Sequence, residues 1–239
     1  MTGETTATTT ATSPVSVTYR PTLPSTVVAV VAALTSLWAL GAARDSTMLL
    51  GAAGVGLVTL GLWVGWRWTR ALGFVLGVLG IPLVAAAVVF AWTGVARATV
   101  FATVAPALVG ALLVTIALAP GRGDSTRTLL KAGSGFVFLA VLVAGVTQLA
   151  DFDALLLSGV AAVVAWDAGE TAVNVGEQLG QEPTTWPVEA AHLAGTLVVG
   201  AVTVALGRVA QGLGTPGLPL TQFAFLLVAV VVLAAALHE

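Results

Sequence analysis

The sequence contains no cysteine, only two histidines and few charged residues: Asp, Glu, Lys and Arg together make up 8% of its 239 residues. Without cysteine the chain has no disulfide, no thiolate nucleophile and no sulfur ligand for a metal. Its net charge of -2 and nine scattered basic residues do not form a nucleic-acid-binding footprint. It also lacks a glycine-rich nucleotide loop, Gly-x-Ser-x-Gly and His-Glu-x-x-His. These absences predict a protein that is not an enzyme and has no cofactor and no catalytic residues.

What the sequence has in abundance is apolar residues, at 58% of the chain, with a mean hydropathy of +1.02. A soluble domain carries about a quarter charged residues, and no soluble fold could bury so much apolar surface. The charges separate apolar stretches of roughly 20 residues, the length that an α-helix needs to cross a bilayer. We therefore predict an all-α, polytopic bundle of about eight transmembrane helices, located in the cell membrane.

The predicted spans follow from where charges, prolines and glycines interrupt the apolar stretches. A Thr-rich tail at residues 1–20 has too few large apolar side chains to fold, and residues 21–239 form a single transmembrane domain. A polar loop is predicted at 121–131, and the sixth span begins after Asp153 but is apolar only as far as Ala165. The number of spans falls to seven if this sixth segment does not cross. The other predicted spans lie near residues 24–43, 47–66, 71–92, 98–119, 132–150, 188–211 and 220–237.

The distribution of basic residues predicts the orientation, because cytoplasmic loops carry the excess of Lys and Arg. Eight spans with a cytoplasmic N-terminus would place Arg20, Arg67, Arg70, Arg122, Arg127 and Lys131 on the cytoplasmic side. Arg44, Arg97 and Arg208 would lie on the other side. Both termini are therefore predicted to be cytoplasmic.

Small residues on the second and third spans predict how these helices pack. Gly61 and Gly65 share one face, as do Gly73 and Gly77, and such pairs allow close contact between helices in a membrane. Pro82 and Pro106 lie near the middles of the third and fourth spans, where each removes a backbone hydrogen bond.

A polar stripe on the sixth and seventh spans is the strongest candidate for a functional site. Its residues recur three or four positions apart, so they share a helix face. A rise of about 1.5 Å per residue places Asp167 about 21 Å beyond Asp153, inside a hydrocarbon core roughly 30 Å thick. The stripe consists of Trp166, Asp167, Glu170, Asn174, Glu177 and Gln178, with Glu189, His192 and Thr196 at a matching level of the next span.

Two interpretations of this stripe are open. In one, the helix leaves the membrane near Ala165, with Trp166 at the interface and Arg67 or Arg70 pairing with the acids. In the other, Asp167, Glu170 and His192 form an intramembrane proton or cation site, because ionisable groups within spans are costly and usually functional. A metal centre is not predicted, because Glu189-x-x-His192 is one such pair where di-iron bundles use two together with further glutamates.

Residues 166–172, 176–180 and 189–192 resemble a family of uncharacterised haloarchaeal membrane proteins. Members of that family are encoded beside MoxR-type AAA ATPases and a soluble protein with a von Willebrand-like domain. The resemblance implies a non-enzymatic membrane subunit or scaffold, on which the stripe docks soluble cytoplasmic partners such as the ATPase. The alternative is a small transporter or proton-coupled carrier with an acidic site in the inner leaflet. Besides partner proteins, the expected environment is the lipid bilayer.

Overall fold

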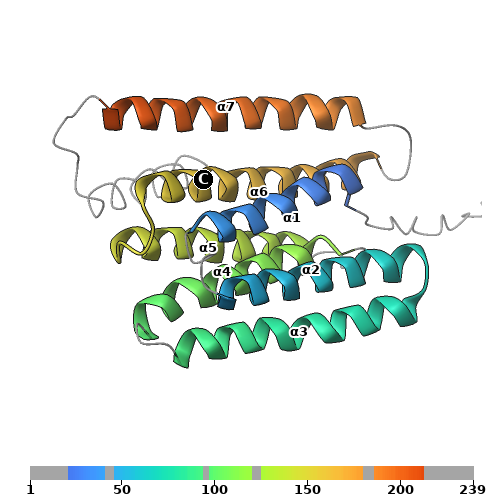
Figure 1. The fold of residues 1–239 in the computed structure, drawn as a ribbon. Coiled ribbons are helices and arrows are strands. Elements are labelled where there is room, and N and C mark those ends of the chain that lie inside the picture. Colours follow the sequence, from blue (N-terminus) through green and yellow to red (C-terminus); the bar gives the residue numbers. More distant parts are fainter. Residues whose placement is uncertain (1–20, 41–45, 94–96, 120–124, 180–185, 213–239) are drawn as a thin grey trace, which may run out of the picture.

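The computed structural model describes residues 21–40, 46–93, 97–119, 125–179 and 186–212. Seven α-helices make up this part of the chain, and their axes run nearly parallel (Figure 1). Five of them are long and apolar enough to cross a membrane, so the chain is a membrane-embedded helical bundle. The helices are α1 (Leu23–Ala39), α2 (Ser46–Arg67), α3 (Arg70–Thr93), α4 (Arg97–Ala117), α5 (Ser125–Val146), α6 (Phe152–Leu179) and α7 (Trp186–Gly212).

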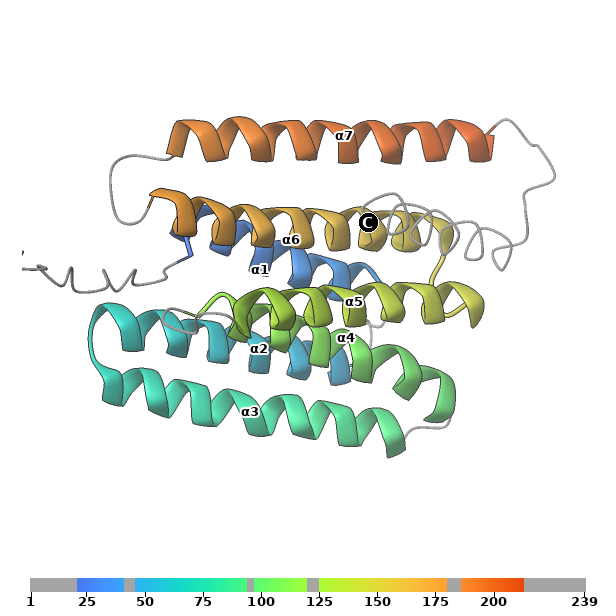
Figure 2. The same cartoon turned by 180° about the vertical axis from the view of Figure 1, so that it is seen from behind.

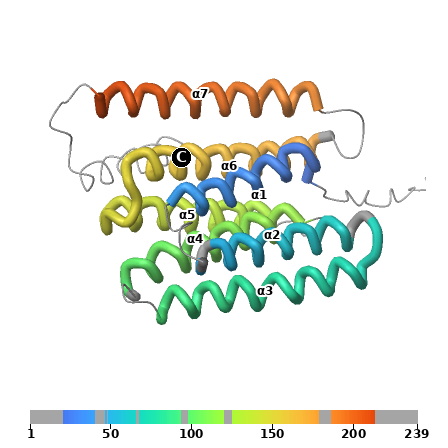
Figure 3. Tube along the Cα trace, viewed as in Figure 1, coloured from blue at the N-terminus to red at the C-terminus, as the bar shows by residue number. Residues whose placement is uncertain are grey.

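The helices are arranged between two outer ones, with α7 along one edge and α3 along the opposite edge (Figure 2). Helix α1 packs along α6 although α6 lies more than a hundred residues later in the chain (Figure 3). The outward faces of α3 and α7 are rich in exposed large apolar side chains, including Phe74, Phe90, Val198 and Val209. Side chains of this kind on the outside of a bundle match a lipid environment rather than water.

The interior is built mainly from small side chains, as expected where helices associate in lipid by close packing. Its largest cluster is dominated by alanine and valine, with Ala87, Ala107, Ala140 and Ala144 almost fully buried. Between α2 and α3 the backbones come close enough that a Cβ at Gly61 would lie 2.6 Å from the amide nitrogen of Gly77. The predicted packing through these glycines is confirmed.

The predicted helices match the observed ones closely except at the start of α5. The predicted loop at 121–131 is wrong for its second half, because α5 already begins at Ser125. Thr126 and Leu130 are buried while Arg127 and Lys131 are exposed, so this polar segment is an amphipathic helical turn rather than a loop. Helix α3 continues through Pro82 and α4 through Pro106.

The sixth and eighth predicted spans decide the number of helices that cross the membrane. Helix α6 is one continuous helix of 28 residues that carries the whole polar stripe through Gln178. The described part of the chain contains seven helices, five of which are long and apolar enough to span a membrane, so the predicted count of about eight is not confirmed. The predicted eighth span at 220–237 and the predicted tail at 1–20 lie outside the described residues.

Candidate functional site

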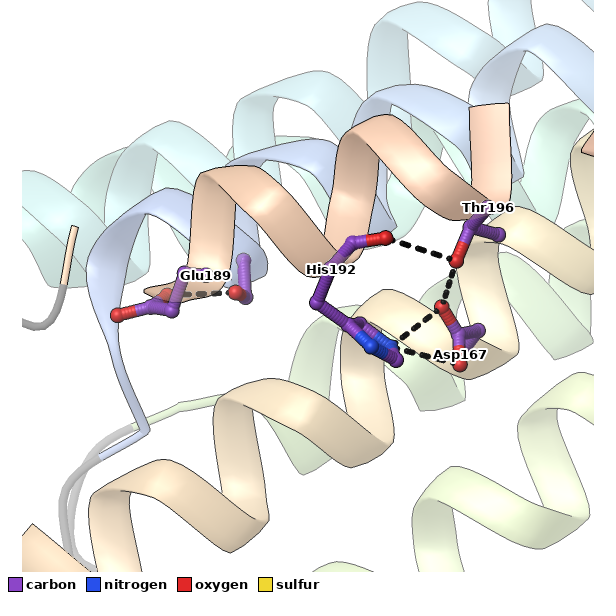
Figure 4. Close-up of polar contacts among 5 residues, drawn as sticks. Asp167, Glu189, His192 and Thr196 are labelled. Atoms are coloured by element: carbon purple, nitrogen blue, oxygen red, sulfur yellow. Dashed lines mark hydrogen bonds and ion pairs between the residues drawn. The ribbon is translucent and has the colours of Figure 1, made fainter. Parts of the chain in front are cut away.

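The polar faces of α6 and α7 meet at Asp167, which lies opposite His192 and Thr196 on the antiparallel α7 (Figure 4). His192 and Thr196 are four residues apart, so both side chains leave the same face of α7. Nε2 of His192 lies 3.0 Å from Oδ2 and 3.1 Å from Oδ1 of Asp167. The hydroxyl of Thr196 donates to Oδ2 at 2.6 Å. An ionised carboxylate only accepts hydrogen bonds, so both donors stabilise its negative charge.

The Asp167–His192 pair lies at the surface of the described bundle. The side chains of Asp167 and His192 are 29% and 48% exposed. The pair is an ion pair when the imidazole carries both protons, and imidazole is the side chain that changes charge near neutral pH. The second proton of the imidazole therefore decides whether the two side chains form a salt bridge or a hydrogen bond between a neutral imidazole and a carboxylate.

Glu189 lies one turn before His192 on α7, and its side chain is fully buried. Its Oε2 accepts hydrogen bonds from the hydroxyls of Ser25 at 2.5 Å and Thr22 at 2.7 Å, both at the start of α1. The amide of Thr22 donates in turn to the carbonyl of Ala172 on α6 at 3.1 Å. Buried polar groups are normally paired in this way. The starts of α1 and α7 are thus joined to α6 by a hydrogen-bonded junction.

The end of α6 is held differently, by an exposed contact with α5. Nη2 of Arg127 lies 2.7 Å from both Oε2 of Glu177 and Oδ1 of Asn174. The sequence suggested Arg67 or Arg70 as the partner of the acids on this stripe, and the structure instead pairs Glu177 with Arg127. Arg70 is exposed at the start of α3, and the side chain of Arg67 lies outside the described residues. The remaining residues of the stripe are Trp166 and Gln178, which are exposed, and Glu170, which is half-buried without a hydrogen bond or ion pair to any described residue.

Two ion pairs mark the two ends of α6 and locate Asp167 between them. Arg208 of α7 pairs with Asp153 at 2.9 Å, and Arg127 pairs with Glu177. At about 1.5 Å per residue, Asp153 and Glu177 are about 36 Å apart along the helix, and Asp167 is about 21 Å from the first and 15 Å from the second. The middle of this interval is therefore only about 3 Å from Asp167. The predicted stripe divides into an inner part around Asp167 and an outer part around Glu177.

An apolar groove of about 630 Å³ runs between α5, α6 and α7 and ends at this inner part. Its walls include Leu142, Leu156, Val160, Val163 and Val199, and its polar end is formed by Asp167, His192 and Thr196. The sequence could indicate which residues share a helix face, but not that α5 and α7 leave a groove between them. In the described part of the chain, no three His, Asp or Glu residues come together as metal ligands.

Residues 82–234 match a family described as a family of unknown function (DUF7519), a match that begins within α3 and includes α4 to α7. No curated protein and no solved structure shows significant similarity to the chain. The matched region contains Asp167, Glu189 and His192, and it covers well over half of the sequence. The chain therefore belongs to this family of unknown function.

Proposed function

We propose that this membrane protein is a small proton-coupled carrier that works through the Asp167–His192 pair. The observation that carries the proposal is the position of Asp167, near the middle of α6 between two terminal ion pairs and bonded to a histidine on the neighbouring helix. A charged group at this depth is costly, and such groups mark ion and proton pathways.

In this proposal, protonation of the His192 imidazole is coupled to the strength of the contact between α6 and α7. With the imidazole protonated, the pair attracts across the helix contact, and without that proton the attraction is lost. Within the described chain α7 packs chiefly on α6, with a smaller contact to α1. Only 11% of the residues in the most apolar stretch of α7 are buried within the described bundle. A helix with so little packing is the element whose position a single ion pair can influence most.

Flux measurements on reconstituted vesicles test this function. A pH gradient across vesicles that contain the protein should drive movement of protons or solute, and Asp167→Asn should abolish it because the amide keeps the shape but carries no charge to pair with the imidazolium of His192. Asp153→Asn is the matched control, since Asp153 lies on the same helix in an exposed pair with Arg208, and it should leave the flux unchanged. If no flux depends on Asp167, the proposal is wrong.

The second candidate is the non-enzymatic scaffold that docks a soluble partner, such as a MoxR-type AAA ATPase module. The supporting observation is that Glu177 and Gln178 are exposed at the end of α6, on the side that we propose to be cytoplasmic together with both termini. Simultaneous substitution of Glu170, Glu177 and Gln178 should then abolish recovery of the partner in a pull-down. The two candidates separate cleanly, because Asp167→Asn should affect the flux alone and the triple substitution the docking alone.

A further inference from the structure

The groove between α5, α6 and α7 has the size and lining of a small-molecule site. Its volume of about 630 Å³ falls in the range of roughly 300–1,000 Å³ that is typical of ligand pockets, which are mostly apolar with a few convergent polar groups. Gly159 lines it, and a Cβ added there would meet nothing within 4 Å. The groove thus has free space in its middle and polar groups at one end.

The charge at that end selects the kind of ligand. Of the described residues that line the groove, only Asp167 and His192 are ionisable. The indole of Trp166 belongs to the same lining, and the faces of indole rings attract cations. A ligand with an apolar body and a positive centre would satisfy the walls and the carboxylate together, whereas an anion would meet Asp167 without a permanent cation beside it.

We propose that this groove binds a lipophilic cation, and that the cation and the imidazolium of His192 compete for the carboxylate of Asp167. This inference rests on the proposed function, whose substrate class it names. When the cation binds beside the carboxylate, the imidazolium of His192 loses its partner and releases its proton to the water, so one positive charge enters as one leaves. No covalent bond changes, and the total charge at the site is conserved.

Other charged groups lie on the helices around the Asp167–His192 pair, and their charges also act on the pH dependence of cation binding. Glu189 is one turn away on α7 and is held by Ser25 and Thr22. Outside that junction, the charged side chains on the neighbouring turns and on α5 are Glu170, Glu177, Arg127 and Lys131. None of these belongs to the groove lining, so a cation in the groove meets Asp167 first.

Binding of tetraphenylphosphonium to the purified full-length protein in detergent tests the proposal, with tetraphenylborate as a probe of the same shape and opposite charge. The cation should bind and the anion should not. Asp167→Asn should weaken cation binding by about tenfold or more, because loss of one partner of a desolvated charge pair costs at least a decade of affinity. Asp153→Asn should bind as the native protein does. In weakly buffered solution, about one proton should be released per bound cation.

A second pair of variants tests the groove itself. Gly159→Leu places a side chain in the open middle of the groove and should block the cation while leaving the Asp167–His192 pair intact. Gly135→Leu is the matched control, because Gly135 is exposed on α5, a Cβ there also meets nothing within 4 Å, and it is not part of the lining. Equal binding by both variants would place the cation elsewhere and overturn the proposal.

The remaining outcomes separate this inference from the proposed function. If the native protein carries Asp167-dependent flux but binds tetraphenylphosphonium no better than tetraphenylborate, the ligand class is wrong and the carrier proposal stands. The same absence of binding is expected if another apolar segment of the chain, such as residues 220–237, fills the groove, and it counts equally against the cation site. If flux and binding are both absent, both proposals fail.

Discussion

The carboxylate of Glu189 and the hydroxyl of Ser25 lie 2.5 Å apart and are both fully buried, although 164 residues separate them in the sequence. Their hydrogen bond joins the first turn of α7 to the first turn of α1. In the described chain α7 packs chiefly on α6 with a smaller contact to α1, so this bond attaches the start of α7 to a second helix of the bundle. It also fixes the turn that precedes His192, so the geometry of the candidate site depends on it.

Substituting Ser25 with alanine should therefore lower the stability of the protein. The change removes one of the two hydroxyl donors that Glu189 accepts from, and under-satisfying a buried acceptor costs about 1–3 kcal/mol. Unfolding in mixed micelles with increasing sodium dodecyl sulfate would measure the loss. The control is Thr26→Ala, because the Thr26 hydroxyl bonds only to the carbonyl of Thr22 on its own helix. Equal losses in the two variants would contradict a special role for the junction.

Much of this site could be predicted from the sequence because it depends on local periodicity. The spacing of Asp167, Glu170, Glu189 and His192 predicts which residues share a helix face, and α6 and α7 do bring Asp167 and His192 together. Glu189 instead bonds to Ser25 and Thr22 at the start of α1. Most helix ends were predictable to within a few residues for the same reason, since charges and prolines interrupt the apolar stretches, but α5 begins at Ser125 rather than at 132.

What could not be predicted are the long-range partners. Arg127, Ser25 and Thr22 bind residues that are at least 47 positions away, and no local pattern specifies which helices become neighbours. The start of α5 was missed because the sequence 125–131 is polar, and polarity alone does not distinguish a loop from an exposed helical turn. Only the packing of α4 and α5 shows that Thr126 and Leu130 face inward.

The glycine contact between α2 and α3 gives a second prediction. A Cβ added at Gly73 would overlap the backbone of Gly65, and it would lie 2.5 Å from the carbonyl oxygen of Gly61, whereas a Cβ at Gly77 would meet nothing within 4 Å. Gly73→Ala should therefore destabilise the protein by about 1–3 kcal/mol through overpacking. Gly77→Ala should be neutral or slightly stabilising, because alanine favours helix more than glycine does. Thermal unfolding in detergent would separate them, and identical midpoints would show that the two helices can move apart at no cost.

The Arg127–Glu177 contact should matter far less for stability. Both side chains are more than a third exposed, and exposed ion pairs contribute about 0–1 kcal/mol. We expect Arg127→Ala to lower stability by at most this amount at low ionic strength and to match the native protein in 0.5–1 M salt, roughly where the screening length falls to a few ångströms. A large effect that salt does not change would mean that Arg127 supports α6 through packing rather than charge.

The depth of α6 in the membrane is the assumption on which the carrier proposal depends, and a chain without cysteine allows it to be measured directly. Val163 and Gln178 both have exposed side chains on α6, so neither position is buried by the described part of the bundle. Val163 lies about 15 Å from Asp153 and about 21 Å from Glu177 along the helix, whereas Gln178 lies beyond Glu177.

A membrane-impermeant maleimide should accordingly label Gln178→Cys in native membranes, provided that the reagent reaches the side of the membrane at which α6 ends. It should leave Val163→Cys unmodified. Both cysteines should react after denaturation, which controls for the reactivity of the thiol. Trp166→Cys, next to Asp167, is the decisive position: protection there places the carboxylate within the hydrocarbon, where its pairing with His192 has functional weight. Rapid labelling at Trp166→Cys would instead mean that α6 leaves the membrane before Asp167, and the exposed stripe would then favour partner docking over transport.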